Sequence, residues 1–361
     1  MSMNPTFVPR EEPQREYSYL TMSRFFAALW VVVFHVGVLM RASGSPVPRL
    51  FDNSIFKLGF LGVSFFFVLS GFILAKMYDL PKIDKRTFYL KRLARIYPSY
   101  FLVLLAIVLI PIFQFPRTIQ YCAPVFLLFN AWIPDASQNL LGPAWSLTCE
   151  AFFYLVFPFI FLWVRSASKA TALLLIVLSF VPSVIVESMS RFGPVHGEVY
   201  FPLLHLPSFL LGILFAGWRS SPGKVWSSVL ALGVAVGLVK VLVPDGLPMK
   251  VGVMALPFAL LIWSLSGVRN PRASAPIAKL FTLQGNASYV LYLVHLPLLM
   301  VLQHFGRLHS AIDAILGVTL AVLLSTLFYL CLDRPIHLAV TRWIKRGMAL
   351  NLPRARTGSR C

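Results

Sequence analysis

The residues of this chain most able to do chemistry are ionisable side chains inside long apolar runs. Arg24 and His35 share the run 22–40. Eleven helical residues correspond to about 1100°, roughly 20° past three full turns, and to about 16 Å along the axis. One helix face would therefore carry a cation near one end and an imidazole beyond the middle. This arrangement suits a substrate tunnel, because ionisable groups within a membrane are costly and usually functional. The alternative is an arginine that extends to the interface and a histidine bonded to a neighbouring helix.

A second polar stripe opens the apolar run 145–164. Ser146, Glu150 and Tyr154 follow one another at four-residue spacing, so they share one helix face. A carboxylate beside an imidazole can orient the ring and stabilise its cation after it accepts a proton. With a cytoplasmic N-terminus, Glu150 is expected near the outer boundary, at about the depth of His35. The alternative is a carboxylate at the membrane interface, in contact with water.

Further polar residues lie on or beside other apolar runs. Ser288, Tyr292 and His295 share one face of the run 286–304. They would either line the same cavity or supply hydrogen bonds between helices. A lone histidine, His205, lies between two prolines, and we expect it to have a structural role because broken helices need polar partners.

Two arginines, Arg92 and Arg95, lie just before the apolar run 98–113. Guanidinium groups three residues apart could clamp phosphates through forked hydrogen bonds. They could equally serve only to set the topology of the membrane spans, which requires no ligand.

The elements that must position these residues are membrane spans. Of the 361 residues, 58% are hydrophobic and only 12% are charged, whereas a soluble domain carries about 25% charged residues. The segment Tyr121–Ile133 is apolar but short, which favours a re-entrant or interfacial segment. The sequence thus predicts an all-α polytopic membrane protein with about ten spans. These are 22–40, 55–77, 98–113, 145–164, 170–187, 200–217, 227–243, 251–266, 286–304 and 311–332.

The basic residues orient these spans. If Tyr121–Ile133 does not cross and the N-terminus is cytoplasmic, three quarters of the 32 lysines and arginines face the cytoplasm, in agreement with the positive-inside rule. We therefore expect residues 1–19 to be a polar cytoplasmic segment and 20–335 the membrane domain. Residues 336–361 would form a basic cytoplasmic tail that begins with an amphipathic helix. The net charge of +19 then points to membrane lipid and not to nucleic acid.

Five motifs in order resemble the acyltransferase-3 family of bacterial integral-membrane O-acyltransferases, in the stand-alone form without a C-terminal hydrolase-like domain. The resemblance extends from about Tyr19 to Trp343. The motifs are Tyr19–Ala28 leading to Phe34-His35, then Gly62–Phe72, Lys91–Pro98, Trp145-Ser146-Leu147 with Glu150, and Ser288–Leu293 with His295.

The chain departs from the family pattern at two places. Thr21, Met22 and Ser23 replace the usual Asp-Gly-Leu, so a role for that aspartate does not carry over. Near the C-terminus, Asp333 before Arg334-Pro335 replaces the usual glutamate and keeps its charge.

The resemblance implies a multi-pass enzyme of the bacterial inner (cytoplasmic) membrane. It would move an acyl group, commonly acetyl, from acyl-CoA to a hydroxyl of an exported or cell-surface glycan such as an exopolysaccharide or a lipopolysaccharide O-antigen. Polysaccharide-assembly proteins are further candidate partners. The rival interpretation is a transporter or flippase for a lipid-linked glycan, whose polar stripes would line a translocation path.

The same resemblance suggests roles for the polar residues. CoA phosphates would dock at Arg92, Arg95 and Arg24. The catalytic set would be His35, Glu150 and Arg24, with His35 acting as general base or forming an acyl-histidine. No metal is expected, because the four cysteines lack ligand spacing. The residues expected to line the substrate cavity are Ser70, Trp145, Ser146, Ser288, Tyr292 and His295.

Overall fold

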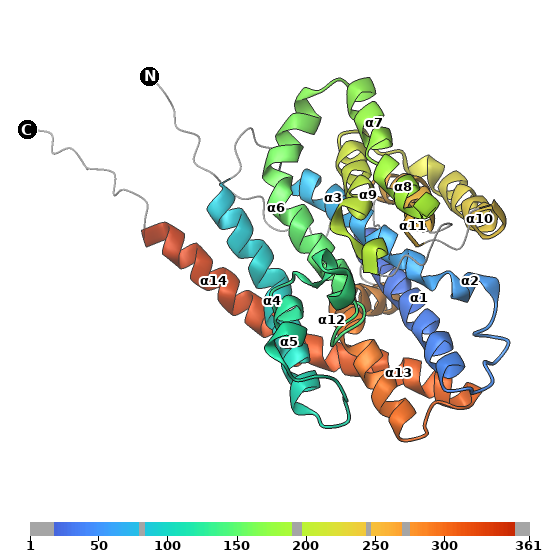
Figure 1. The fold of residues 1–361 in the computed structure, drawn as a ribbon. Helices are drawn as coiled ribbons and strands as arrows, with labels where there is room; N and C mark the ends of the chain where they lie inside the picture. Colours follow the sequence, from blue (N-terminus) through green and yellow to red (C-terminus); the bar gives the residue numbers. More distant parts are fainter. Residues whose placement is uncertain (1–17, 79–83, 190–196, 243–246, 269–274, 351–361) are drawn as a thin grey trace, which may run out of the picture.

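The computed structural model describes residues 18–78, 84–189, 197–242, 247–268 and 275–350, and every regular element within these ranges is helical. Figure 1 shows these helices gathered into one bundle. Most of the expected N-terminal segment 1–19 and the end of the expected C-terminal tail lie outside the described residues.

Seven helical segments of the described chain are long and apolar enough to cross a membrane. They coincide with seven of the ten predicted spans. The segments are Ser18–Ala42 (α1), Gly59–Met77 (ending in α3, Gly62–Met77), Lys85–Leu109 (α4), Ala144–Val164 (in α6, Ala144–Ser166), Pro222–Val239 (mostly α10, Val225–Leu242), Pro276–His304 (α12) and Ala311–Ile344 (beginning with α13, Ala311–Phe328).

The other three predicted spans fall on shorter apolar helices. The run 170–187 is divided between α7 (Lys169–Leu178) and α8 (Val181–Met189). The run 200–217 forms α9 (Pro202–Ala216), and 251–266 lies within α11 (Leu247–Leu265). Length and composition therefore support seven spans, and ten remains a prediction.

Helix α4 begins much earlier than the predicted span 98–113 that it contains. It runs without interruption from Lys85 to Leu109, although Pro98 lies inside it. Proline in a helix interior removes one backbone hydrogen bond and favours a kink, but it does not end this helix. Arg92 and Arg95, which precede Pro98, are therefore part of the same long helix as the predicted span.

The short apolar segment Tyr121–Ile133 does not form a spanning helix. Its helix α5, Ile119–Phe126, has eight residues and is about 12 Å long, against a hydrocarbon core of about 30 Å. One hydrogen bond ties the chain after α5 to α6, and a second closes the loop between the two helices. The Thr148 hydroxyl donates to Asn130 Oδ1 over 2.6 Å, and Asn130 Nδ2 donates to the Ser137 carbonyl over 2.9 Å.

Helices α3 and α9 make the most extensive contact in the bundle. Their backbones meet at two glycines, since a Cβ atom on Gly71 would collide with the Phe209 carbonyl and one on Gly212 with the Val68 carbonyl. Small residues at such crossings let membrane helices gain packing contacts without a hydrophobic driving force. This crossing holds α3 firmly beside the polar residues described below.

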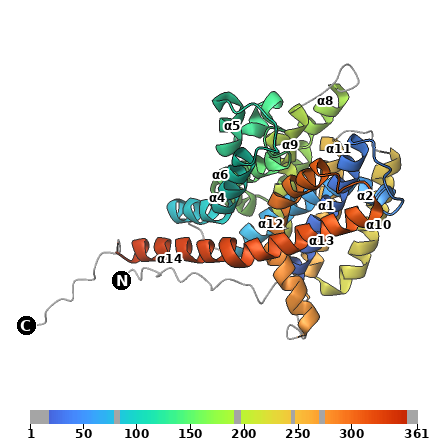
Figure 2. The ribbon, with the colours of Figure 1, turned by 90° about the horizontal axis from the view of Figure 1, so that it is seen from below.

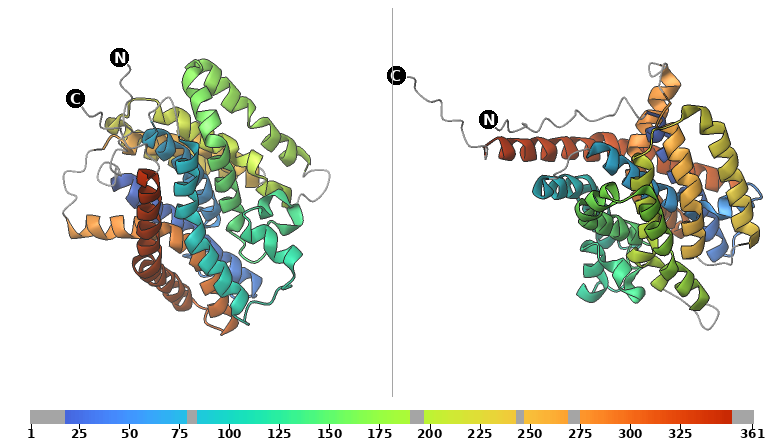
Figure 3. Two further views of the ribbon diagram at one scale, coloured as in Figure 1. Left: turned by 90° about the vertical axis from the view of Figure 1, so that its left-hand side faces the viewer. Right: turned by 90° about the horizontal axis from the view of Figure 1, so that it is seen from above.

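At the C-terminal end, α13 continues through a π-helical turn, Tyr329–Asp333, into α14 (Arg334–Leu350). Figure 2 shows α14 extending past the other helices, and the left view of Figure 3 shows α14 alongside α4. The amphipathic helix predicted at the beginning of the tail 336–361 falls within α14. Its position on the cytoplasmic membrane surface remains a prediction.

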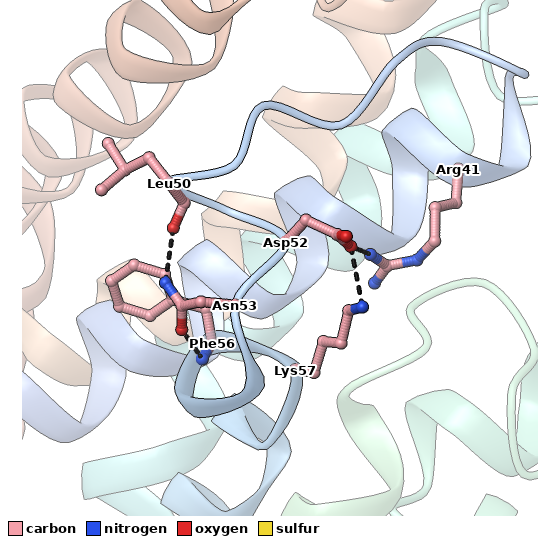
Figure 4. A network of polar contacts seen from close by, with 6 residues as sticks. All are labelled: Arg41, Leu50, Asp52, Asn53, Phe56 and Lys57. Atoms are coloured by element: carbon pink, nitrogen blue, oxygen red, sulfur yellow. Dashed lines mark hydrogen bonds and ion pairs between the residues drawn. The ribbon is translucent and has the colours of Figure 1, made fainter.

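The loop after α1 is held by a small polar network (Figure 4). Asp52 accepts from Arg41 over 3.2 Å and pairs with Lys57 over 2.9 Å. Asn53 caps the short helix α2 (Ser54–Lys57) by accepting from the Phe56 amide. Exposed ion pairs of this kind contribute little stability, so the network mainly orients the loop.

Candidate active site

A cavity of about 230 Å³ lies between α1, α3, α4, α6 and α12. Apolar side chains form part of its wall, and the rest is polar. The polar lining residues are Arg24, Ser70, Arg92, Arg95, Ser146, Glu150, Tyr154, Ser288, Tyr289 and Tyr292. The three arginines and most of the polar residues singled out in the sequence thus share one cavity.

Two of the arginines come from one face of α4. The guanidinium of Arg92 lies 5.8 Å from the ring centroid of Tyr154, and that of Arg95 lies 5.8 Å from the ring centroid of Tyr289. The Nε–H of Arg92 is buried without a hydrogen-bond partner among the described residues. An unsatisfied buried donor costs about 1–3 kcal/mol, and an anionic ligand would remove that cost.

Arg95 also faces a buried carboxylate, Asp333, which is only 5% exposed. Arg95 Nη1 lies 3.7 Å from Asp333 Oδ2, and the Ser99 hydroxyl donates to Asp333 Oδ1 over 2.6 Å. Asp333 ends the π-helical turn, and such turns are frequent at functional sites. The sequence analysis noted the retained charge of Asp333 but did not connect it with Arg95, because the two are far apart in the chain.

Glu150 belongs to the arginine cavity. Its carboxylate accepts hydrogen bonds from the Tyr154 hydroxyl and, over 3.4 Å, from the Ser70 hydroxyl. It also interacts electrostatically with Arg24. Glu150 was expected to orient His35, but its hydrogen-bond partners lie on α3 and α6, and it faces Arg24 on α1. A partly buried carboxylate in an apolar bundle requires compensation of its charge, and this cavity supplies three guanidinium groups.

His35 instead pairs with His295. His295 Nε2 lies 3.2 Å from His35 Nδ1, and the ring centroids are 4.9 Å apart. Each ring also bonds the backbone one turn earlier, His35 Nδ1 to the Val31 carbonyl over 2.9 Å and His295 Nδ1 to the Leu291 carbonyl over 3.0 Å. His295 is fully buried, and His35 is partly exposed. Of the two alternatives for His295, the structure therefore shows the hydrogen bond between helices.

Tyr292 connects the two parts of the site. Its ring lines the cavity, and its centroid lies 5.8 Å from that of His295. Its hydroxyl bonds Ser146 Oγ over 2.7 Å. The two histidines are not among the residues that line the cavity, so Tyr292 lies on the side of the cavity nearest to them.

Close packing of α12 on α1 brings the two histidine-bearing helices together. A Cβ atom on Gly285 would collide with the Thr21 carbonyl. One turn later on α12, Ser288 lines the cavity and donates to the Gly285 carbonyl over 2.7 Å. The same crossing places Arg24 in the cavity wall.

Trp145 and His205, both singled out from the sequence, lie in the core beside the cavity. Trp145 was expected to line the cavity, but it is outside the lining set and packs against Tyr200 and His205, with centroids 5.0 Å away in each case. His205 is buried and bonds the Val199 carbonyl over 3.0 Å. This contact agrees with the structural role expected for His205.

Residues 17–331 match the family model of the acyltransferase-3 domain. These helices and this cavity therefore belong to a membrane-embedded acyltransferase of that family, and the expected membership is confirmed. The family model begins and ends within a few residues of the membrane domain expected from the sequence.

Particular relatives support the same assignment. The chain is 32% identical over 324 residues to the acyltransferase MdmB of Streptomyces mycarofaciens, covering 80% of each protein. It is 24% identical over 310 residues to the putative acetyltransferase ORF330 of Acidianus two-tailed virus, covering 82% of this chain and 86% of that protein. It is 25% identical over 358 residues to the O-acetyltransferase OatA of Staphylococcus aureus, covering 87% of this chain and 56% of OatA. No solved structure matches the chain.

Proposed function

We propose that this O-acyltransferase takes an acetyl group from acetyl-CoA on the cytoplasmic side of a bacterial inner membrane. It then transfers the group to a hydroxyl of an exported or cell-surface glycan. The observation that carries the proposal is the arginine cavity, in which three guanidinium groups line a space within an apolar bundle and, among the described residues, are faced by only two carboxylates, Glu150 in the lining and Asp333 beside Arg95. That surplus of positive charge is stabilised best by an anionic ligand.

The phosphates of CoA fit this surplus. Arginine binds phosphate through paired, charge-assisted hydrogen bonds, and the unpaired Nε–H of Arg92 is one available donor. Arg92 and Arg95 lie in the first half of α4, which the distribution of basic residues places toward the cytoplasm. Acyl-CoA would therefore meet these arginines on the side from which it arrives.

The acyl group would then extend past Tyr292 toward His35. The ring of His295 contacts both residues: its centroid lies 5.8 Å from that of Tyr292 and 4.9 Å from that of His35. His35 would accept the proton of the attacking hydroxyl or carry the acyl group as a covalent intermediate. The names of two relatives as acetyltransferases support acetyl as the transferred group. The glycan acceptor rests on the family resemblance.

A transfer assay tests this function directly. The purified protein is incubated with acetyl-CoA labelled in its acetyl group and with envelope glycans isolated from bacteria that carry the gene. We expect label on the glycan, whereas a transporter would leave it on CoA. His35→Ala should lower the rate about 100-fold or more, in the range of a lost general base.

His304→Ala is the matched control, because His304 is an exposed histidine at the end of α12. It should transfer acetyl at the normal rate. A His35→Ala protein with normal abundance and normal transfer would overturn the catalytic assignment. Mass spectrometry of envelope glycans from cells with and without the gene would identify the acceptor.

A further inference from the structure

The hydrogen bonds of the two histidines determine where their protons lie. The Nδ1 atoms of His35 and His295 both bond backbone carbonyls, those of Val31 and Leu291. A carbonyl oxygen only accepts, so both Nδ1 atoms must carry hydrogen. In a neutral imidazole the other nitrogen is then an acceptor. His295 Nε2 therefore offers its lone pair to His35 Nδ1–H over 3.2 Å.

We propose that His295 is the positioning residue of His35, which it holds in the tautomer whose Nε2 is free to accept a proton or an acyl group. The proposal rests on the acyl-transfer function proposed above and extends it. In this arrangement the Nδ1–H of His35 is shared between the Val31 carbonyl and His295 Nε2. Its Nε2 keeps a lone pair, which is the requirement for a general base or a nucleophile.

The arrangement corresponds to the third member of a catalytic triad, which holds the histidine in its correct tautomer and stabilises the imidazolium. Here the acceptor is a neutral imidazole and not a carboxylate. Glu150, the carboxylate that the sequence suggested for this task, is already bonded to Tyr154 and Ser70. A neutral partner suits the site, because a carboxylate beside the neutral His35 ring would be an unpaired charge inside the bundle, which is costly.

The direct reaction can be followed atom by atom. The acceptor hydroxyl gives its proton to His35 Nε2, and its oxygen forms a bond to the thioester carbonyl carbon. The carbon–sulfur bond then breaks, and the departing CoA thiolate takes the proton from His35 Nε2. His35 Nδ1–H stays directed at His295 Nε2 throughout, and both rings finish as they began.

Burial separates the roles of the two rings. His295 is fully buried, whereas His35 is partly exposed, so His35 is the more accessible of the two rings. His295 could also serve only as a bond between α12 and α1. The two roles differ in what they require, because positioning needs an acceptor at the Nε2 position and packing needs only a side chain of similar size.

The first test measures the tautomers in the wild-type protein. Nitrogen-15 NMR of histidine-labelled protein is recorded at a pH where both rings are neutral, with His35→Ala and His295→Ala samples for assignment. We expect both rings to be protonated at Nδ1 and unprotonated at Nε2. A proton on Nε2 of His35 would overturn the proposal. This result does not depend on any acceptor, so it remains decisive if the transfer assay fails.

The second test uses variants of His295 in the acetyl-CoA transfer assay. His295→Leu should lower kcat about 10- to 100-fold, as is typical of a lost supporting hydrogen bond, and leave KM for acetyl-CoA unchanged. His295→Gln places an amide oxygen near the original Nε2 and should restore most of the rate. His295→Asn has a shorter side chain and should not.

The variants are compared at equal abundance and equal thermal stability. Rescue by glutamine but not by asparagine supports positioning. A His295→Gln protein as slow as His295→Leu, or a His295→Leu protein with full activity, overturns it. If wild-type protein itself transfers no acetyl group, the proposed function fails, and the tautomer of His35 in the His295→Ala sample decides whether His295 sets it. An unchanged Nδ1 proton in that sample would show that the Val31 carbonyl is sufficient and would overturn the positioning role.

Discussion

At the scale of single residues, the arginines of the cavity differ in how far they are already compensated. Arg95 has a carboxylate partner in Asp333 at 3.7 Å, and Arg24 interacts with Glu150. Arg92 lies over the Tyr154 and Phe88 rings and keeps an unpaired buried Nε–H. We therefore expect binding of the anionic acyl donor to depend more strongly on Arg92 than on Arg24 or Arg95.

Replacing Arg92 tests this expectation. Arg92→Gln should raise KM for acetyl-CoA about 10- to 100-fold, the value of one or two hydrogen bonds to a charged group. Arg92→Lys keeps the charge but loses the forked geometry, so its KM should lie between those of the wild-type protein and Arg92→Gln. Steady-state kinetics with varied acetyl-CoA provides the measurement.

Arg86→Gln is the control, because Arg86 lies on the same helix but is exposed and outside the cavity. It should leave KM unchanged. If Arg92→Gln and Arg86→Gln behave alike, the arginine at position 92 does not bind the donor.

At the scale of helices, the site depends on how closely their backbones approach. Ser70 donates to Glu150, and its neighbour Gly71 contacts the backbone of α9. The α3–α9 crossing therefore controls the distance between α3 and the carboxylate on α6. Overpacking a close contact costs about 1–3 kcal/mol.

Gly212→Ala should lower the stability of the protein by about that amount or more, because its Cβ would collide with the Val68 carbonyl. Thermal unfolding of the detergent-solubilised protein provides the measurement. Gly233→Ala on α10 is the matched control, since nothing lies within 4 Å of a Cβ atom there. It should be neutral or slightly stabilising, because alanine favours helix. Equal melting temperatures for the two variants would show that the backbone contact is unimportant.

At the scale of the whole molecule, the mechanism requires one orientation in the membrane. Donor and acceptor reach the site from opposite sides, so the first half of α4 must face the cytoplasm and the loop after α1 must face outward. The positive-inside rule favours this orientation. It remains a prediction, because the bundle by itself does not indicate which side is which.

Cysteine labelling tests the orientation. Ser43 and Ser166 are exposed residues at opposite predicted faces, after α1 and at the end of α6. In a background without native cysteines, Ser43→Cys should react with a membrane-impermeant maleimide in intact cells. Ser166→Cys should react only after the membrane is opened. The reverse pattern would invert the topology and place the arginine cavity away from cytoplasmic acyl-CoA.

Much of the fold could be predicted from the chain alone. Long apolar runs with few charges indicate helices in lipid, because backbone groups there must be satisfied within the segment. Helical spacing likewise placed Ser146, Glu150 and Tyr154 on one face, and all three line the cavity. The apolar run 98–113 did not indicate that α4 begins at Lys85, because the residues before Pro98 are basic and their helical continuation is not part of the apolar signal.

The amino-acid sequence determined which helices form and which of their faces are polar, because these properties depend on neighbours within a few turns. It did not determine which polar faces meet. The pairings of His35 with His295, of Glu150 with Ser70, and of Arg95 with Asp333 were decided by the tertiary structure. The physical reason is that helix packing depends on backbone approach and on compensation of buried charge between segments distant in the chain.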